Sequence, residues 1–264
     1  MKRTTAAARG TRRLALFGAV VLVSSAAMSA SHAAADGGAG PLGVTVTAAP
    51  GARTDRVGAL FHEGESADSP GGHFCTASVV HSPGHDLVLT AAHCLAGDET
   101  LYFAPGYRDG QAPHGLWTVA RRHLPEGWAD GGQDEDSDLA FAVLEPDEEG
   151  QEVEDVVGAL RFTPGTATGA TAVTVTGYPA DRDTPVTCTA HPRPHGPTQQ
   201  SVTCPAFSAG TSGSPWVSGD GRVVGVIGGY EQGGDTDDVS YSVVLGKEAA
   251  RLYATATDND DGTD

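Results

Sequence analysis

The chain has 264 residues, with 34 acidic against 16 basic side chains and a formal net charge of −18 at pH 7. This balance argues against nucleic acid or an anionic membrane surface as a partner, because both bind proteins through an excess of Lys and Arg. It favours solubility outside the cell.

The N-terminal segment has the layout of an export signal. A basic region ends at Arg13, an apolar stretch runs from Leu14 to Val23, and small residues continue through Ala35. The apolar stretch is about half of the roughly 20 residues that a bilayer span requires. We therefore predict a signal peptide over residues 1–35 and a secreted, extracellular protein.

Two features of this signal stay open. Cleavage can follow Ala33 or Ala35, and the pair Arg12-Arg13 is compatible with either general or twin-arginine export. Removal of residues 1–35 would take away five basic residues and no acidic one, leaving 11 basic against 34 acidic residues. The mature chain would then carry a formal charge near −23.

Four cysteines, Cys75, Cys94, Cys188 and Cys204, follow the signal, an even number in an exported chain. This indicates two disulfides. Four cysteines allow three pairings, and their grouping into an early and a late pair favours Cys75–Cys94 and Cys188–Cys204. A four-cysteine zinc site is disfavoured because the sequence contains no Cys-x-x-Cys pair.

Residues 36–55 are rich in Gly, Ala, Pro and Thr without sustained periodicity, so we interpret them as a linker or short propeptide. From Arg56 the chain changes to short β-like runs bounded by Gly, Pro and Asp, at spacings typical of a barrel or sandwich. The first series comprises VGALF (57–61), FCTASVV (74–80), DLVLTAA (86–92), LWTVARR (116–122) and DLAFAVLE (138–145).

A second series of β-like runs follows the acidic segment 146–155. The break near residue 150 predicts two β domains of ordinary size, over residues 56–150 and 151–256. The second series comprises ATAVTVTGY (170–178), PVTCTA (185–190), QSVTCPA (200–206), SPWVS (214–218), RVVGVIGGY (222–230) and VSYSVVL (239–245).

The end of the second domain contains helix formers. Residues 246–256 place Ala249, Leu252 and Tyr253 on one face, which predicts a C-terminal helix. The acidic tail, residues 257–264, is expected to be disordered.

The first candidate catalytic residue is His93, in the segment Thr90-Ala91-Ala92-His93-Cys94 at the end of an apolar strand. Small neighbours and a disulfide can hold its imidazole in one place, as a general base requires. Taken alone, a structural histidine is an equally good interpretation.

The second candidate is Asp138, which opens an alternating apolar run. An aspartate at the mouth of a strand can be shielded enough to orient an imidazole and to stabilise its protonated form. The neighbouring Asp134, Glu135 and Asp136 are interpreted as a solvated acidic loop, because only Asp138 adjoins the strand.

The third candidate is Ser212, in the segment Gly210-Thr211-Ser212-Gly213-Ser214-Pro215. Flanking glycines allow a tight turn that leaves the serine hydroxyl accessible to a substrate carbonyl. The same turn can aim the amides of Gly210 and Ser212 at one point, as an oxyanion hole does. Alone the segment is a weak signal; together with His93 and Asp138, in this order, it is strong.

These segments resemble the signatures of the chymotrypsin-like serine protease family, in particular bacterial secreted trypsin-like and glutamyl-endopeptidase-like peptidases. The likeness covers about residues 56–253 and includes HFCTASVV before the first cysteine pair. It implies an all-β fold of two six-stranded antiparallel β-barrels with a C-terminal helix. It also implies a serine endopeptidase in which Ser212 is the nucleophile, His93 the general acid and base, and Asp138 its orienter.

One departure from the family pattern concerns activation. Many animal members have an aspartate before the nucleophile, which pairs with a newly cut N-terminal amine, whereas this chain has Thr211. We therefore expect no such switch, and we interpret Val57 to Phe61 as a first strand rather than a new terminus. The Thr211 hydroxyl can hydrogen-bond to backbone within its own loop.

A second departure concerns the specificity pocket. Trypsin relatives have an aspartate six positions before the serine, where this chain has Ala206, and glutamate-cleaving relatives have a histidine in the strand flanking the pocket. The matching stretch here contains Gly228, Gly229 and Tyr230. The resemblance implies a pocket for a neutral or apolar side chain, narrowed by Tyr230, unless Glu231 or Asp235 supplies a charge.

The remaining expectations concern partners and competing functions. Protein or peptide substrates, a monomer, and no cofactor or catalytic metal are expected. Calcium binding stays open at the acidic clusters 130–138 and 145–155. The alternative function is a catalytically weak protease-fold binding module. An α/β-hydrolase is disfavoured because that fold orders its triad Ser, acid, His.

Overall fold

The computed structural model describes residues 41–65, 72–129, 131–166, 169 and 171–258. The predicted signal peptide and residues 259–264 of the predicted tail lie outside the described residues. Within the part that is described, no helix is long and apolar enough to cross a bilayer.

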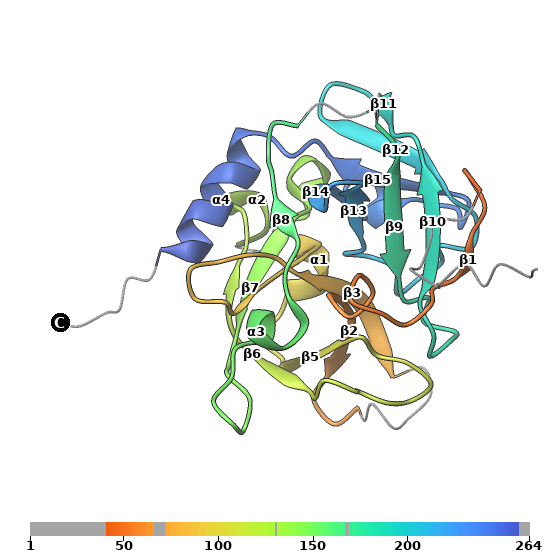
Figure 1. The fold of residues 1–264 in the computed structure, drawn as a ribbon. Coiled ribbons are helices and arrows are strands. Elements are labelled where there is room, and N and C mark those ends of the chain that lie inside the picture. The colour runs from red at the N-terminus through yellow and green to blue at the C-terminus, as the bar shows by residue number, and fades with distance from the viewer. Residues whose placement is uncertain (1–40, 66–71, 130, 167–168, 170, 259–264) are drawn as a thin grey trace, which may run out of the picture. The chain divides into compact units, whose positions relative to one another are not determined.

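The N-terminal half forms a closed antiparallel barrel (Figure 1). All five β-like runs of the first series contain a strand, and the sixth strand, β5, was missed because its run is short and ends in Pro105. In barrel order the strands are β2 (Val57–His62), β3 (His73–Val79), β4 (Leu87–Thr90), β7 (Ala140–Leu144), β6 (Trp117–His123) and β5 (Leu101–Pro105).

Apolar side chains fill this barrel, with Leu60, Phe103 and Trp117 among the largest buried ones. Helix α3 (Val153–Val157) closes one side of the same core, because its buried Val153 and Val157 pack into it. The segment that we expected to open the second domain at residue 151 therefore lies against the first barrel.

The C-terminal half consists of two sheets, and its predicted closure into a second six-stranded barrel is not observed. A six-stranded sheet has the order β1 (Val46–Thr47), β10 (Val186–Ala190), β9 (Val173–Gly177), β13 (Pro215–Ser218), β14 (Arg222–Val226) and β8 (Arg161–Phe162). A three-stranded sheet has the order β11 (Arg193–His195), β12 (Gln199–Thr203) and β15 (Val239–Val243).

Side chains bridge the two sheets where a closed barrel would have ladder hydrogen bonds. The Ser242 hydroxyl accepts from the Val226 amide at 3.0 Å, and the Gln200 side chain donates to the Val224 carbonyl at 2.9 Å. On the other side, the disulfide between Cys188 of β10 and Cys204 joins the sheets. The Val226 amide has a single hydrogen, so its bond to Ser242 leaves it unavailable to a neighbouring strand at this point.

Both predicted disulfides are confirmed, Cys75–Cys94 in the N-terminal half and Cys188–Cys204 in the C-terminal half. Each closes a loop of under 20 residues, with sequence separations of 19 and 16. Such a bridge contributes about 3 kcal/mol on the chain-entropy estimate.

The segment interpreted from the sequence as a linker or short propeptide carries a strand. Val46 and Thr47 form β1 and pair with β10, and the amides of Gly43 and Ala48 donate to carbonyls on the same side of the C-terminal half. The described part of this segment is therefore packed against the fold.

The predicted C-terminal helix is confirmed as α4 (Lys247–Thr257). Its predicted face packs on the N-terminal half: Ala249 is buried, and Leu252 and Tyr253 pack on a core that includes Phe141 of β7. The Tyr253 hydroxyl also donates to the His81 carbonyl at 2.6 Å. The helix thus attaches the end of the chain to the first barrel (Figure 1).

His73 makes the stability of the fold sensitive to acid. It is 2% exposed, its Nε2 contacts the Arg182 carbonyl at 3.1 Å, and its Nδ1 has no partner among the described residues. Burial lowers the pKa of His73 from 6.5, against the opposing effects of the Arg182 hydrogen bond and then the charge of Asp183. Below about pH 6.5 the unfolded chain therefore takes up a proton that the folded chain resists.

We expect the melting temperature to fall as the pH drops below about 6.5, and His73→Gln to flatten this dependence. Burial also lowers the pKa of His123, so part of the slope should persist. Thermal denaturation between pH 7.5 and 5 measures both effects, with the exposed His191→Gln as control. Equal slopes for all three proteins would contradict the assignment.

Candidate active site

The first barrel holds His93 at the start of a short helix. Strand β4 ends at Thr90, and α1 (Ala92–Leu95) follows directly, anchored by the Cys75–Cys94 disulfide. Ala91 and Ala92 are fully buried, whereas the His93 side chain remains 13% exposed. Small neighbours and the disulfide therefore hold the backbone while the ring faces the site.

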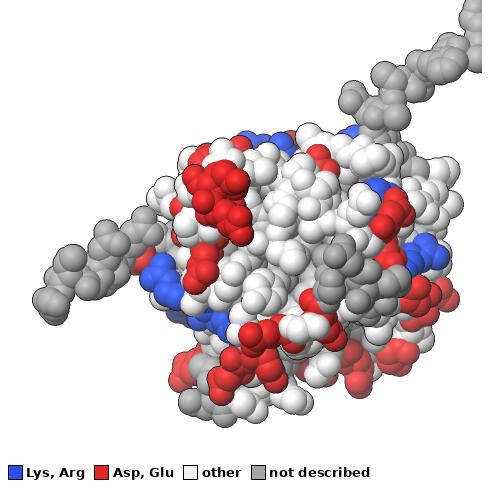
Figure 2. Space-filling view, turned by 90° about the horizontal axis from the view of Figure 1, so that it is seen from below, with Lys and Arg blue, Asp and Glu red and all other residues white. Residues whose placement is uncertain are grey.

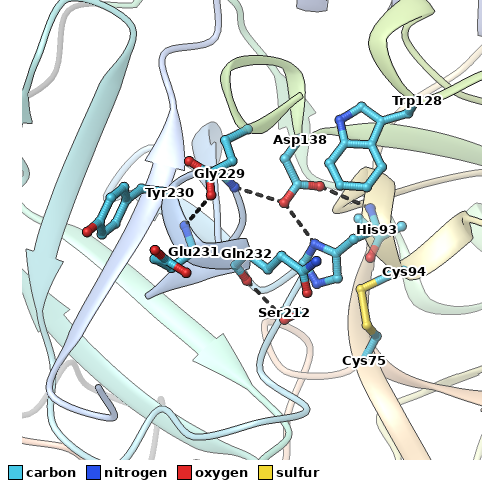
Figure 3. Close-up of polar contacts among 12 residues, drawn as sticks. Cys75, His93, Cys94, Trp128, Asp138, Ser212, Gly229, Tyr230, Glu231 and Gln232 are labelled. Carbon is cyan, nitrogen blue, oxygen red and sulfur yellow. Dashed lines mark hydrogen bonds and ion pairs between the residues drawn. A yellow bond between two sulfur atoms is a disulfide. The ribbon is translucent and has the colours of Figure 1, made fainter. Parts of the chain in front are cut away.

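Asp138 is fully buried and accepts three N–H hydrogen bonds (Figure 3). Its Oδ2 accepts from His93 Nδ1 at 2.8 Å and from the Gly229 amide at 2.9 Å, and its Oδ1 accepts from the His93 amide at 3.0 Å. A carboxylate can only accept, so the neutral imidazole carries its proton on Nδ1. Nε2 is then the nitrogen with a free lone pair.

Trp128, in α2 (Glu126–Ala129), packs beside this pair. Its ring centroid lies 6.4 Å from that of His93, and the residue is 5% exposed. Its indole nitrogen donates to the Asp134 carbonyl at 2.8 Å, which fixes the ring. An apolar ring at this position keeps water from the pair and strengthens the interaction between imidazole and carboxylate.

The three acids before Asp138 are not only a solvated loop. Glu135 accepts from the Glu231 amide at 3.0 Å, and Asp134 accepts from the Ser137 hydroxyl at 2.9 Å. Asp136 accepts from Thr198 at 2.7 Å, and hydrogen bonds from Thr198 and then Gln199 lower the pKa of Asp136. Glu135 and Asp136 therefore connect the loop before β7 to the C-terminal half, whereas Asp134 bonds within the loop itself.

Ser212 lies on the side of the His93 ring away from Asp138, at the boundary of the two halves (Figure 3). Its loop is compact because of two glycines with positive φ: a Cβ at Gly210 would lie 2.6 Å from the Tyr178 carbonyl oxygen, and one at Gly213 2.0 Å from the Thr76 oxygen. The Ser212 hydroxyl lies 3.5 Å from the Gln232 carbonyl, at the limit of hydrogen bonding.

The peptide groups of this loop are held in place from outside it. The Ala209 carbonyl accepts from the Ala180 amide at 2.7 Å, so the Gly210 N–H of the same planar, trans peptide points the opposite way. The Gly210 carbonyl accepts from the Thr76 hydroxyl at 2.9 Å. Within the described residues, the amides of Gly210 and Ser212 donate to no acceptor.

Thr76, in β3, is the main contact between the first barrel and this loop. Its amide donates to the Ser212 carbonyl at 2.7 Å, and its hydroxyl also accepts from the Tyr178 amide at 2.9 Å. The residue is fully buried. One threonine of the N-terminal half thus restrains the backbone on both sides of Thr211.

The local hydrogen bond expected of Thr211 is present. Its hydroxyl donates to the Ser208 carbonyl at 2.7 Å. Val57 to Phe61 lie within β2, as predicted, and the Val57 amide donates to the Thr54 carbonyl at 3.0 Å. The Val57 amide is therefore bonded within its own turn, and Val57 pairs with Ser78 of β3.

The four residues assigned to a specificity pocket differ from one another in what they contact. Gly228 and Gly229 pack against Asp138 and Gln199, where a Cβ on Gly229 would lie 2.3 Å from Gln199 Oε1. Tyr230 begins a short 3₁₀ turn (Tyr230–Gly233), and its amide donates to Gln199 at 3.1 Å. Ala206 is exposed and has a positive φ of 65°.

Sequence reasoning missed Thr76, Trp128 and Gln199. Each acts through a partner far along the chain, and a lone Thr, Trp or Gln gives no signal of such a contact.

The cluster of Cys75, His93 and Cys94 near the site cannot bind a metal through sulfur, because both sulfur atoms are used in the Cys75–Cys94 disulfide.

The fold and these contacts define a chymotrypsin-like protein with histidine, aspartate and serine gathered where its two halves meet. Residues 75–226 match the family model described as a trypsin-like peptidase domain. Because the match spans more than half of the chain, this protein belongs to that family. The comparison with curated proteins yields no match.

Solved structures agree with this assignment. Protease Anisep from Arthrobacter nicotinovorans is 26% identical with a TM-score of 0.68, covering 81% of this chain and 99% of its own. The thermostable serine protease AL20 from an extremophilic microorganism is 27% identical with a TM-score of 0.67, covering 80% and 100%. A Glu endopeptidase, 17% identical with a TM-score of 0.66 and coverage of 83% and 98%, shares the fold.

Proposed function

We propose that this protein is a secreted serine endopeptidase that cleaves peptide bonds through an acyl-enzyme on Ser212. The observation that carries the proposal is the fully buried Asp138 carboxylate bound to His93 Nδ1, with Ser212 on the other side of the ring. Family membership and the two related proteases support a peptidase.

The proposed reaction begins when the Ser212 hydroxyl attacks the scissile carbonyl and its proton passes to His93 Nε2. Asp138 stabilises the resulting imidazolium through Nδ1–H. The oxygen of the tetrahedral intermediate accepts from the amides of Gly210 and Ser212. His93 then gives the proton to the leaving amine, and water, activated by the same imidazole, hydrolyses the ester.

The competing function is a catalytically weak binding module with a protease fold. A fluorophosphonate probe separates the two, because it bonds covalently to an activated serine and not to an ordinary hydroxyl. We expect stoichiometric labelling of Ser212, read by mass spectrometry. An unlabelled, folded protein would contradict the proposed function.

Proposed substrates have a neutral or apolar side chain at the cleaved position, and we propose that Ala206, Gly228, Gly229 and Tyr230 form the pocket for it.

Figure 2 shows acidic side chains outnumbering basic ones on the face seen from below, which fits the expectation that nucleic acid and anionic membranes are not partners. Two disulfides suit an oxidising, extracellular location.

The Thr76 hydroxyl should help to keep the oxyanion hole formed. In Thr76→Val the Gly210 carbonyl and the Tyr178 amide lose their shared partner, so the Gly210–Thr211 peptide can rotate. We expect kcat to fall by about 10- to 100-fold with little change in KM, because the loss of a complete oxyanion donor costs about 10²- to 10³-fold. Steady-state kinetics on a small ester substrate measure this.

Thr76→Ser is the matched control for that substitution. It keeps the hydroxyl and should restore most of kcat. If Thr76→Ser were as slow as Thr76→Val, packing of the methyl group rather than the hydrogen bonds would be responsible.

Activity should not depend on a particular N-terminus. Thr211 carries no charge and bonds within its own loop, so no distant amine is needed. Forms beginning at Asp36, Arg53 and Val57 should turn over one ester at similar rates. Those lacking β1 should melt at a lower temperature. If only the Val57 form were active, and acetylation of its amine abolished that activity, the terminus would be part of the mechanism.

A further inference from the structure

Two histidines and two acids form a cluster outside the active site. His81 and His85 lie in the loop between β3 and β4, and Glu154 and Asp155 lie in α3. One ligand atom from each of His81, His85 and Glu154 can be chosen so that all three lie within 4.8 Å of one another. The catalytic reaction proposed above uses none of them.

Hydrogen bonds orient these side chains. His81 Nδ1 lies 2.7 Å from Glu154 Oε1, and His85 Nδ1 lies 2.8 Å from Asp155 Oδ1. A carboxylate at His85 Nδ1 holds the proton there and leaves Nε2 free to bind a metal. Most metal-binding histidines have such a partner on the ring nitrogen that does not bind the metal.

The backbone of the cluster is held by the surrounding elements. The His81 amide donates to the Leu160 carbonyl at 2.9 Å, and the Glu154 amide donates to the His85 carbonyl at 2.9 Å. Tyr253 of α4 donates to the His81 carbonyl at 2.6 Å. The side chains therefore project from positions fixed by both halves of the chain, which reduces the entropy lost when they bind one ion.

We propose that His81, His85 and Glu154 bind one Zn²⁺ ion, with Asp155 orienting His85. Two imidazoles and a carboxylate are ligands that Zn²⁺ prefers, and water can complete four-coordination because the histidine side chains are partly exposed. Ca²⁺ does not fit, because it takes six to eight oxygen ligands. The acidic surface attracts cations in general, whereas the histidines provide the selectivity.

The bound ion would act as a structural staple. It would join the loop between β3 and β4 to α3, which connects the two halves, and the same loop contacts α4. An ion that binds only the folded chain raises its melting temperature by mass action. This role does not depend on the proposed protease activity.

The test is calorimetric titration of the protein, treated with a chelator and dialysed, with ZnCl₂ and separately with CaCl₂. We expect one Zn²⁺ per chain, no comparable binding of Ca²⁺, and a rise in melting temperature that a chelator reverses. His81→Gln and His85→Gln should each remove this binding, and Asp155→Asn should weaken it by about 10- to 100-fold.

His114→Gln is the matched control, because His114 faces Asp55 at 3.9 Å and belongs to no group of three potential metal ligands among the described residues. It should bind Zn²⁺ like the unmodified protein. The proposal would be overturned if the unmodified protein bound no Zn²⁺. It would also be overturned if His81→Gln and His85→Gln bound Zn²⁺ as tightly as the unmodified protein, which would place the ion elsewhere, for example at His93. Circular dichroism of each variant checks that these exposed substitutions leave the fold intact.

Discussion

Ser212→Ala is expected to reduce kcat for peptide hydrolysis by on the order of 10⁶-fold, because the nucleophile is lost while the amides of Gly210 and Ser212 still bind the carbonyl oxygen. The backbone contacts of this position, including the Thr76 amide to the Ser212 carbonyl, do not involve the hydroxyl. The melting temperature should therefore stay close to that of the unmodified protein. Peptide turnover and thermal denaturation are the two measurements.

Ser214→Ala is the matched control in the same turn. The Ser214 hydroxyl is fully buried and has no hydrogen-bond partner among the described residues, so its removal should leave most of the activity. Near-normal turnover by Ser212→Ala, or equal losses in both variants, would contradict the assignment of Ser212 as nucleophile.

Asp138→Asn should lower kcat by about 10⁴-fold near neutral pH. When the asparagine amide group faces His93 Nδ1, the proton of the neutral imidazole moves to Nε2, and the ring can no longer accept the serine proton. The Gly229 and His93 amides also face this side chain. Either orientation of the asparagine therefore sets its NH₂ against an N–H donor, which costs about 1–3 kcal/mol of stability.

Kinetics measured below the melting temperature of Asp138→Asn separate its loss of kcat from its loss of stability. Asp136→Asn is the control, since Asp136 bonds to Thr198 and Gln199 rather than to the imidazole. It should lose far less activity than Asp138→Asn. Comparable losses would show that the acidic loop as a whole, and not the carboxylate bound to His93, supports the reaction.

Local patterns in the sequence were sufficient for much of the fold. Alternating apolar runs identified five strands of the first barrel, and the spacing of Ala249, Leu252 and Tyr253 identified α4. The grouping of four cysteines indicated both disulfides. These features depend on neighbours within about 20 residues, so the pattern itself contains the information.

The candidate triad was also readable, for a different reason. His93, Asp138 and Ser212 each lie in a short segment whose composition suits its proposed catalytic role. Their order along the chain reduces the number of candidate folds. Their distances came from the tertiary structure, which brings His93 and Asp138 within 2.8 Å across 45 positions.

Only the tertiary structure decided the contacts between distant segments. Thr76 meets Gly210 across 134 positions, and Glu154 meets His81 across 73. Val46 pairs with Thr187, which places a strand in a segment whose composition is typical of a linker. The Ser242 hydroxyl accepts from the Val226 amide, so a side chain occupies a backbone donor between the two C-terminal sheets. Each contact depends on two surfaces meeting after folding, and a single residue type at either end is compatible with many partners.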